Sequence, residues 1–175
     1  AIKIKPDYAV AHNNLGVALA EQGKNEEAIA HYTEALRIAP QDVKAHNNLG
    51  NALAKQGKIQ EAIDHYTKAL KINPNYIVVY SNLGNALAEQ GRIDEAIVYY
   101  TQAIRIKPDD VEAHTNLGVA LAKQGKNQEA IDHFTKALRI KPDSAQLHNN
   151  MGIALAEQGK IQEAIAHYTK AIKIK

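Results

Sequence analysis

Apolar side chains recur at helical spacing in two consecutive segments near the start of the chain. In residues 9–22 one face of a helix is marked by Ala11, His12, Leu15, Ala18 and Leu19. From about Glu26 onward, the same spacing is kept by Ala28, Ile29, Tyr32, Ala35, Leu36 and Ile38. Gly23, between the segments, can adopt the left-handed conformation that ends a helix, and Pro40 disfavours helix in the residue before it. The pattern therefore predicts two helices joined by a tight turn.

The same pattern returns along the whole chain at an interval of 34 residues. Every proline lies on this interval, at Pro6, Pro40, Pro74, Pro108 and Pro142. The glycines form two series with the same interval. One comprises Gly16, Gly50, Gly84, Gly118 and Gly152, and the other Gly23, Gly57, Gly91, Gly125 and Gly159. Residues 43–76 and 111–144 are identical at 25 of 34 positions, which indicates an array of repeats. A helix pair of this size cannot bury its apolar face alone, so stacking on neighbouring pairs has to supply the core.

The glycines of the first series lie inside the first helix of each pair. Glycine there costs about 0.8 to 1.0 kcal/mol relative to alanine. We therefore expect the partner helix to approach the backbone closely at these positions. Asp42, Asp110 and Ser144 are expected to cap the following first helix, with Asp7 and Asn75 one place earlier in the other repeats.

These residues resemble a known family. The relevant run is His12, Leu15, Gly16, Leu19, Ala28, Tyr32, Ala35 and Pro40. It resembles the tetratricopeptide repeat (TPR), whose first helix carries Trp, Leu, Gly and Tyr and whose second carries Ala and an aromatic residue before Pro. The family's Trp is replaced by His12, His46, Tyr80, His114 and His148, and its first-helix Tyr by Leu19 and its counterparts. The resemblance implies an all-α, right-handed superhelical solenoid of antiparallel helix pairs, in which the first helices line a concave groove.

We expect a single TPR array over residues 1–175. Its five units are residues 7–40, 41–74, 75–108, 109–142 and 143–175, and residues 1–6 are the end of a truncated preceding repeat. Residues 1–5 and 171–175 have the same sequence, so the chain is expected to begin and end inside equivalent second helices. Repeat arrays normally carry a polar cap. Without one, the apolar face around Ile165, Tyr168 and Ile172 predicts end-to-end homo-association.

The predicted groove presents one asparagine in every repeat: Asn14, Asn48, Asn82, Asn116 and Asn150. A carboxamide offers a donor and an acceptor together, as a peptide backbone does, so a row of them can hold an extended chain without recognising its side chains. The row is similar to the asparagine ladder in the repeat arm of O-linked N-acetylglucosamine transferases. The other candidate peptide contacts are Asn13, Asn47, Thr115, Asn149, Val17, Asn51, Val78, Asn85 and Val119. The alternative is that the asparagines brace adjacent repeats by hydrogen bonds, and both roles can coexist.

Two further patterns concern the groove. Charge alternates along the first helices at Glu21, Lys55, Glu89, Lys123 and Glu157, so neighbouring repeats are expected to pair across the stack.

The third repeat has additional aromatic surface, where Tyr80 and Tyr100 are expected in the core and Tyr76 and Val78 are the better ligand contacts. Binding of a terminal carboxylate is not expected, because the groove offers asparagines where chaperone-tail binders of this family use basic residues.

The histidines fall into two series, His12, His46, His114, His148 and His31, His65, His133, His167. The third repeat replaces both with Tyr80 and Tyr99, a change that a zinc site does not tolerate. We therefore predict half-buried packing positions and no metal. If the rings are buried and neutral, the melting temperature should fall between about pH 7 and about pH 5.

Composition narrows the function classes. The net charge of +2 does not favour nucleic acid, and the longest apolar run, residues 77–80, is far too short to cross a membrane. The absence of cysteine fits a reducing compartment, which weakly favours the cytoplasm. Polar candidates recur as framework or caps, so neither a catalytic residue nor a cofactor is expected. The first hypothesis is a protein-interaction scaffold that binds an extended peptide. The alternatives are the substrate-recruiting arm of a larger, glycosyltransferase-like enzyme and a self-stacking assembly module.

Overall fold

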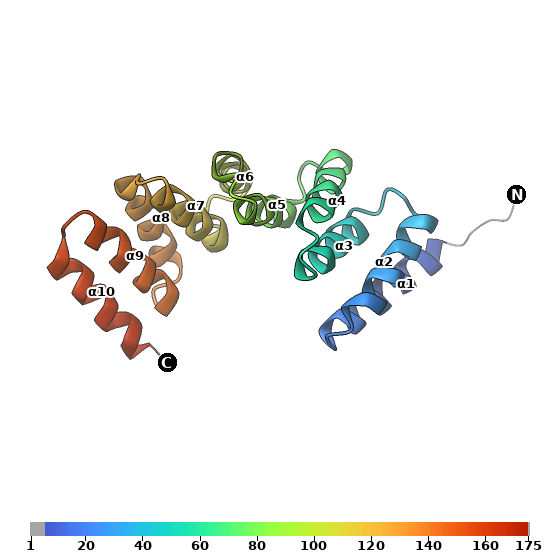
Figure 1. The fold of residues 1–175 in the computed structure, drawn as a ribbon, viewed down its shortest axis with the longest axis horizontal. Coiled ribbons are helices and arrows are strands. Elements are labelled where there is room, and N and C mark those ends of the chain that lie inside the picture. Colours follow the sequence, from blue (N-terminus) through green and yellow to red (C-terminus); the bar gives the residue numbers. More distant parts are fainter. Residues whose placement is uncertain (1–5, 175) are drawn as a thin grey trace, which may run out of the picture. The chain divides into compact units, whose positions relative to one another are not determined.

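A computed structural model describes residues 6–174, and side chains from Tyr8 onward. This range contains ten α-helices and no strand (Figure 1). The helices are α1 (Pro6–Glu21), α2 (Asn25–Ile38), α3 (Val43–Lys55), α4 (Ile59–Ile72), α5 (Ile77–Glu89), α6 (Ile93–Ile106), α7 (Val111–Lys123), α8 (Asn127–Ile140), α9 (Ala145–Glu157) and α10 (Ile161–Lys173). The all-α prediction is confirmed. None of these helices is both long enough and apolar enough to span a bilayer.

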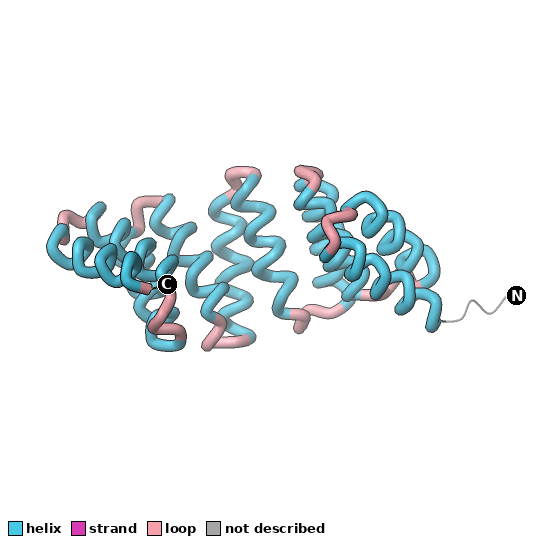
Figure 2. Tube along the Cα trace, turned by 90° about the horizontal axis from the view of Figure 1, so that it is seen from below, coloured by secondary structure: helices cyan, strands magenta, loops and turns pink. Residues whose placement is uncertain are grey.

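The chain divides into two compact units, Ala1–Gly91 with α1–α5 and Arg92–Lys175 with α6–α10. Within each unit, every helix packs against the next one along the chain, and the connecting loops are short (Figure 2). The odd-numbered helices also contact each other, α1 with α3, α3 with α5, and α7 with α9. The predicted stack of antiparallel helix pairs is therefore present in both units. The handedness of the superhelix and the unit boundaries stay predictions, and residues 1–5 lie outside the described part.

The two glycine series have the two roles that the sequence indicated. Gly23, Gly57, Gly91, Gly125 and Gly159 have φ between 75° and 78°, the left-handed conformation that ends the first helices. Four of the glycines inside the first helices face an aromatic ring of the paired second helix. A Cβ atom on Gly118 would lie 2.5 Å from Cε1 of Phe134, and Gly16, Gly50 and Gly152 face Tyr32, Tyr66 and Tyr168 in the same way. Close approach of the two helices thus accounts for these four glycines.

Three of the expected helix caps are formed. The Asp42 carboxylate accepts from the backbone N–H groups of Lys44 and Ala45, Asp110 accepts from Ala113, and Ser144 accepts from Leu147. Asn75 does not cap α5, so that prediction is wrong. The N-cap position of α5 is held by Tyr76, and no side chain caps this helix. The side chain of Asp7 lies outside the described residues.

The apolar face of the first helices is buried in the interior repeats but not in α1. Leu49 and Leu117 are each 4% exposed, whereas their counterpart Leu15 is 46% exposed. Ala11 and Ala18 are exposed as well. In the interior repeats this face packs against the preceding second helix, as α3 does on α2, and no described helix precedes α1. Burial of this face therefore depends on a neighbouring repeat, as expected for a helix pair that cannot bury its apolar face alone.

Candidate functional site

The candidate site lies on one face of the first helices, which we call the first-helix face. In the first unit it is formed by Asn14 and Val17 of α1, Asn48 and Asn51 of α3, and Val78, Asn82 and Asn85 of α5. In the second unit it is formed by Asn116 and Val119 of α7 and Asn150 and Ile153 of α9. Every one of these side chains is half-buried or exposed. Because the repeat length is constant, equivalent residues return to the same face.

Asparagines brace successive first helices in the first unit. Nδ2 of Asn48 donates to Oδ1 of Asn13 at 3.0 Å, and Nδ2 of Asn82 donates to Oδ1 of Asn47 at 2.9 Å. The acceptors are buried, with Asn13 8% and Asn47 4% exposed, whereas Asn48 and Asn82 are half-buried. The bracing role considered from the sequence is therefore present.

The remaining polar positions next to the asparagine row differ between repeats. The Thr115 hydroxyl donates to the backbone oxygen of Val111 at 2.6 Å, and its side chain is buried. Asn149, at the equivalent position of α9, is exposed. Thr115, Asn13 and Asn47 thus offer little surface to a ligand. A carboxamide has two N–H donors and an acceptor oxygen, so the bracing bond of Asn48 uses one donor and fixes the direction of the other groups.

The bracing bond makes a prediction with a matched control. Asn48→Ala should leave the buried oxygen of Asn13 without its donor, which costs about 1 to 2 kcal/mol of unfolding free energy. Asn14 occupies the same place in the repeat, but it is exposed. Asn14→Ala should therefore change stability by less than about 0.5 kcal/mol. Urea unfolding of both variants checks this, and equal losses would show that the bond does not stabilise the stack.

Hollows open on the first-helix face at the same place in both units. In the first unit, a hollow of about 180 Å³ is lined by Val17, Asn48, Asn51 and Tyr32. In the second unit, a hollow of about 430 Å³ is lined by the equivalent residues Val119, Asn150, Ile153 and Phe134. Ile153 is 46% exposed. These hollows are where the face can admit a side chain of a ligand.

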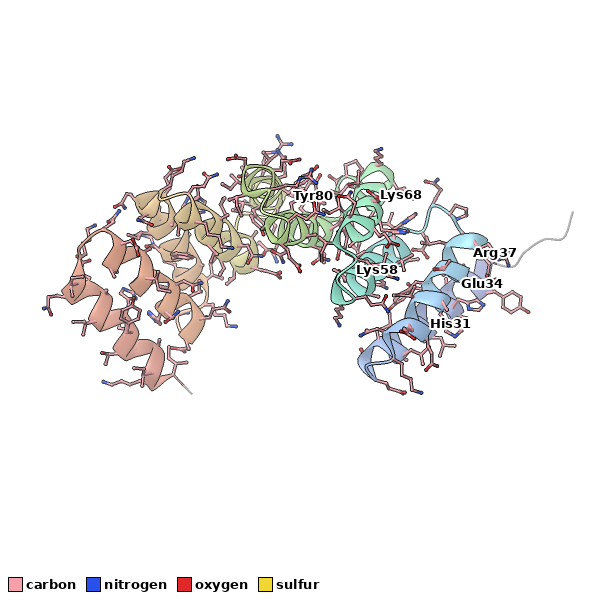
Figure 3. The ribbon with its side chains drawn as sticks, in the orientation of Figure 1. His31, Glu34, Arg37, Lys58, Lys68 and Tyr80 are labelled. Carbon is pink, nitrogen blue, oxygen red and sulfur yellow. The ribbon has the colours of Figure 1, made fainter. Side chains whose placement is uncertain are left out.

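The alternating charges lie on the walls of these hollows rather than in ion pairs. Glu21 and Lys55 line the hollow of the first unit, and Lys123 and Glu157 that of the second. The ion pairs among the described residues that the structure shows are Arg37–Glu34, Arg92–Glu95 and Lys107–Asp110, each three residues apart on the chain. The predicted pairing of Glu21 with Lys55 and of Lys123 with Glu157 is therefore wrong. Figure 3 labels Glu34 and Arg37 on α2.

The histidines form four ring pairs away from the first-helix face. Nδ1 of His46 lies 2.9 Å from Nδ1 of His65, and Nε2 of His46 lies 3.1 Å from the backbone oxygen of Pro40. The same Nδ1 contact joins His12 to His31, His114 to His133 and His148 to His167. In the third repeat the Tyr80 hydroxyl, labelled in Figure 3, donates to the Pro74 oxygen at 2.8 Å. Tyrosine thus keeps the hydrogen bond to the proline carbonyl.

This arrangement has electrostatic consequences. Burial, together with the charge of His46, lowers the pKa of His65 to about 4, and the same causes, with His114 as the neighbour, lower the pKa of His133 to about 4. Burial also lowers the pKa of His46 and His167. In the described part of the chain, no group of three or more His, Cys, Asp or Glu residues is arranged to hold a metal ion.

The aromatic surface of the third repeat divides between core and surface. Tyr100 is buried and Tyr80 half-buried, whereas Val78 is 50% exposed on α5 and Tyr76 is half-buried. Val78 therefore stays a candidate contact.

Sequence reasoning missed two features of the surface. It did not include Phe134 in the site, although the change from Tyr32 to Phe134 at one repeat position was a visible signal. It also missed a hollow of about 690 Å³ lined by residues of α2, α3 and α4, among them His46, His65, Lys68 and Lys71. An equivalent hollow of about 520 Å³ involves His148, His167, Lys170 and Lys173. Basic residues near the C-terminal end of a helix also complement its dipole, so the lysines alone do not mark a site.

Comparison with known families identifies the repeat. Models of the TPR family match residues 18–57 and 84–125, residues 43–76, residues 109–175, and residues 1–30 and 65–98. Together these matches run along the entire chain. The chain belongs to the tetratricopeptide repeat family. No curated protein matches the chain.

Solved TPR structures have the same fold. MamA from Desulfovibrio magneticus RS-1 is 24% identical, with a TM-score of 0.87, and the match covers 96% of this chain and 95% of that one. PilF from Pseudomonas aeruginosa is 24% identical, with a TM-score of 0.88, covering 97% and 77% of the two chains. YrrB, described as a TPR protein with an unusual peptide-binding site, is 26% identical with a TM-score of 0.78, covering 95% and 86%. The fold and these neighbours support the interpretation of the TPR array as a protein-interaction scaffold.

Proposed function

We propose that this TPR array binds an extended peptide along its first-helix face and has no catalytic role. The observation that carries the proposal is the hollow that recurs between consecutive first helices in both units, with a carboxamide, Asn48 or Asn150, on its wall. The similarity to YrrB supports a peptide as the partner. Nucleic acid, a membrane and cofactors have no part in this proposal, and the cytoplasm stays its expected location.

The asparagine row is proposed to contact the peptide backbone. Each bracing bond uses one N–H donor of the asparagine carboxamide and holds that side chain in place. The second N–H and the oxygen of the same carboxamide can then face a ligand. A preoriented side chain loses less conformational entropy when it binds. Each hydrogen bond to the peptide would contribute roughly 0.5 to 1.5 kcal/mol, so several repeats have to act together for useful affinity.

The test uses a phage-displayed library of linear random peptides selected on the protein. A selected peptide is then compared with versions N-methylated at single backbone positions, because methylation removes a backbone donor without altering any side chain. We expect N-methylation to weaken binding by about tenfold at several positions, and the triple Asn48, Asn82, Asn116→Ala variant to lose binding while circular dichroism shows it folded. Failure to select any peptide, or binding insensitive to both changes, would refute the proposal.

A second candidate function, end-to-end self-assembly, is favoured by the exposure of two complementary faces. Leu15 of α1 is 46% and Ile165 of α10 50% exposed, whereas the interior counterparts Leu49 and Ile63 are 4% and 7% exposed. In the interior repeats these two kinds of face pack against each other, as α2 does on α3. We propose that α10 of one molecule receives α1 of the next in the same manner.

Sedimentation velocity over a range of protein concentrations tests this assembly. Wild-type protein should form larger species as concentration rises, and Leu15→Glu or Ile165→Glu should keep it monomeric, because a charge in a buried apolar contact is strongly unfavourable. Glu26→Gln changes an exposed charge elsewhere and serves as the control. A wild-type protein that stays monomeric at high concentration would exclude the assembly. Peptide binding is measured separately, so either function can fail alone.

A further inference from the structure

The two hollows on the first-helix face differ in chemistry although they occupy the same place in the repeat. Both have a valine, Val17 or Val119, and an asparagine, Asn48 or Asn150, on their walls. The hollow of the second unit is larger, about 430 Å³ against about 180 Å³. The other residues that line each hollow determine which kind of ligand side chain it can accommodate.

Polar groups occupy the hollow of the first unit. The hydroxyl of Tyr66 donates to Oδ1 of Asn51 at 2.7 Å, which fixes this amide on the wall. The hydroxyl of Tyr32 lies close to the carboxylate of Glu21. Burial raises the pKa of Tyr32, and the negative charge of Glu21 raises it further. A ligand side chain placed here would meet an amide, a phenol and a carboxylate.

The hollow of the second unit has lost these polar groups. Phe134 occupies the position of Tyr32 and has no hydroxyl, and Ile153 occupies the position of Asn51 and has no amide. Ala122 lines this hollow as its counterpart Ala20 lines the first, so the difference lies at the positions of Phe134 and Ile153. The uncharged part of the lining is therefore mostly apolar, and its two amides, Asn127 and Asn150, can hydrogen-bond to a peptide backbone.

The size and charge of this hollow indicate what fits it. A cavity of about 150 Å³ lined by apolar side chains can hold a benzene-sized group, so the space here is ample for a leucine or phenylalanine side chain. The two charged residues on the walls, Lys123 and Glu157, have opposite signs, so the site does not favour a ligand of either charge. Ile153 is 46% exposed, and covering it removes apolar surface from water.

We propose that the hollow between α7 and α9 is an anchor subsite for one large uncharged apolar side chain of the bound peptide, and that the equivalent hollow between α1 and α3 is not. This inference rests on the proposed peptide-binding function. The apolar residue of the peptide then lies against the second unit, where Ile153 and Phe134 provide selectivity.

The subsite can be tested without a full-length peptide. The probe is N-acetyl-leucine methylamide, which carries one apolar side chain between two peptide groups, and the readout is the methyl NMR signals of the protein. We expect saturable shifts of the Val119 and Ile153 methyl groups at millimolar probe, and no saturable shift at Val17. N-acetyl-alanine methylamide should bind at least about tenfold more weakly, because it buries less apolar surface.

Two substitutions complete the design. Ile153→Asn installs the residue that the first unit has at this position and should abolish the saturable shift at Val119. Ile140→Asn removes an isoleucine that is 42% exposed on α8 but does not line the hollow, and it should leave binding unchanged. Equal shifts at Val17 and Val119, equal affinity for both probes, or full binding by Ile153→Asn would each overturn the inference. If the probe binds as expected but no library peptide does, the subsite stands and the proposed peptide binding fails.

Discussion

Gly118→Val is expected to lower the free energy of unfolding by about 2 kcal/mol, although valine favours a helix more than glycine does. The physical reason is the approach of the paired helix, because a Cβ at this position would lie 2.5 Å from Cε1 of Phe134. Phe134 is 1% exposed and cannot turn away into solvent. Either the ring or the helix has to shift, and both disturb a packed interface. Urea unfolding monitored by circular dichroism measures the loss.

A double-mutant cycle separates overpacking from other causes. Phe134→Leu alone should be destabilising, because it leaves a cavity in the core. The pair Gly118→Val with Phe134→Leu should lose less than the sum of the single losses, with a coupling of at least about 1 kcal/mol, because the smaller side chain makes room for the new one. Additive losses would mean that the ring is not what excludes a side chain at Gly118.

Acidification from about pH 6.5 to about pH 4 is expected to destabilise the protein. The pKa of His65 and of His133 is about 4 in the folded protein against 6.5 in the unfolded chain, so the unfolded state binds more protons in this window. Stability is therefore complete above about pH 6.5 and is lost as the pH falls toward about 4. One pKa unit corresponds to about 1.4 kcal/mol, and because the rings are only half-buried, solvent screening reduces the effect to about 1 kcal/mol per pair.

The geometry of the pair disfavours its second additional proton. Since Nε2 of His46 is in contact with the Pro40 oxygen, it carries the proton, and its Nδ1 accepts from Nδ1 of His65. One additional proton can bind to Nε2 of His65 without breaking this bond. A second proton would have to bind to Nδ1 of His46, which would place its N–H against the N–H of His65 and break the bond. Among neighbouring charges, Lys68 also disfavours protonation of His65, whereas Asp64 favours it.

The third repeat supplies the control for the pH experiment. The double variant His114→Tyr, His133→Tyr copies the residues at positions 80 and 99 and removes both imidazoles of the pair. Its melting temperature should fall less on acidification than that of the wild type. The carboxylates of Glu34 and Glu95, whose pKa is lowered by the hydrogen bonds from Arg37 and Arg92, lose their pairing only below about pH 4.5 and thus outside most of the window. An unchanged pH profile in the variant would show that the histidine pairs are not responsible.

The sequence predicted the fold because each local signal repeated the others. The helical spacing of apolar residues, the glycines expected at left-handed turns and the capping residues such as Asp42 all predicted the same pair of helices. Because that pair repeats every 34 residues and cannot bury its apolar face alone, the pairs have to stack. The sequence predicted an uncovered apolar face around Ile165 but not the exposure of Leu15, which differs from Leu49 only in whether a described helix precedes and covers it. The bracing of Asn48 on Asn13 joins residues 35 positions apart, which depends on how two repeats are set against each other. The apolar character of the proposed subsite likewise depends on the packing of two helices, because Ile153 of α9 and Phe134 of α8 line the same hollow.

The turn glycines have one practical consequence for protein engineering. A Cβ atom added to Gly23, Gly57, Gly125 or Gly159 would meet no heavy atom within 4 Å, so the tips of these bends face open space. Lengthening such a tip costs little entropy, roughly 0.6 kcal/mol for each doubling of its length. Reporter tags or grafted epitopes can therefore be inserted after Gly23, Gly57 or Gly159 without altering the proposed anchor subsite, whereas Gly125 lines that hollow and should be left unchanged.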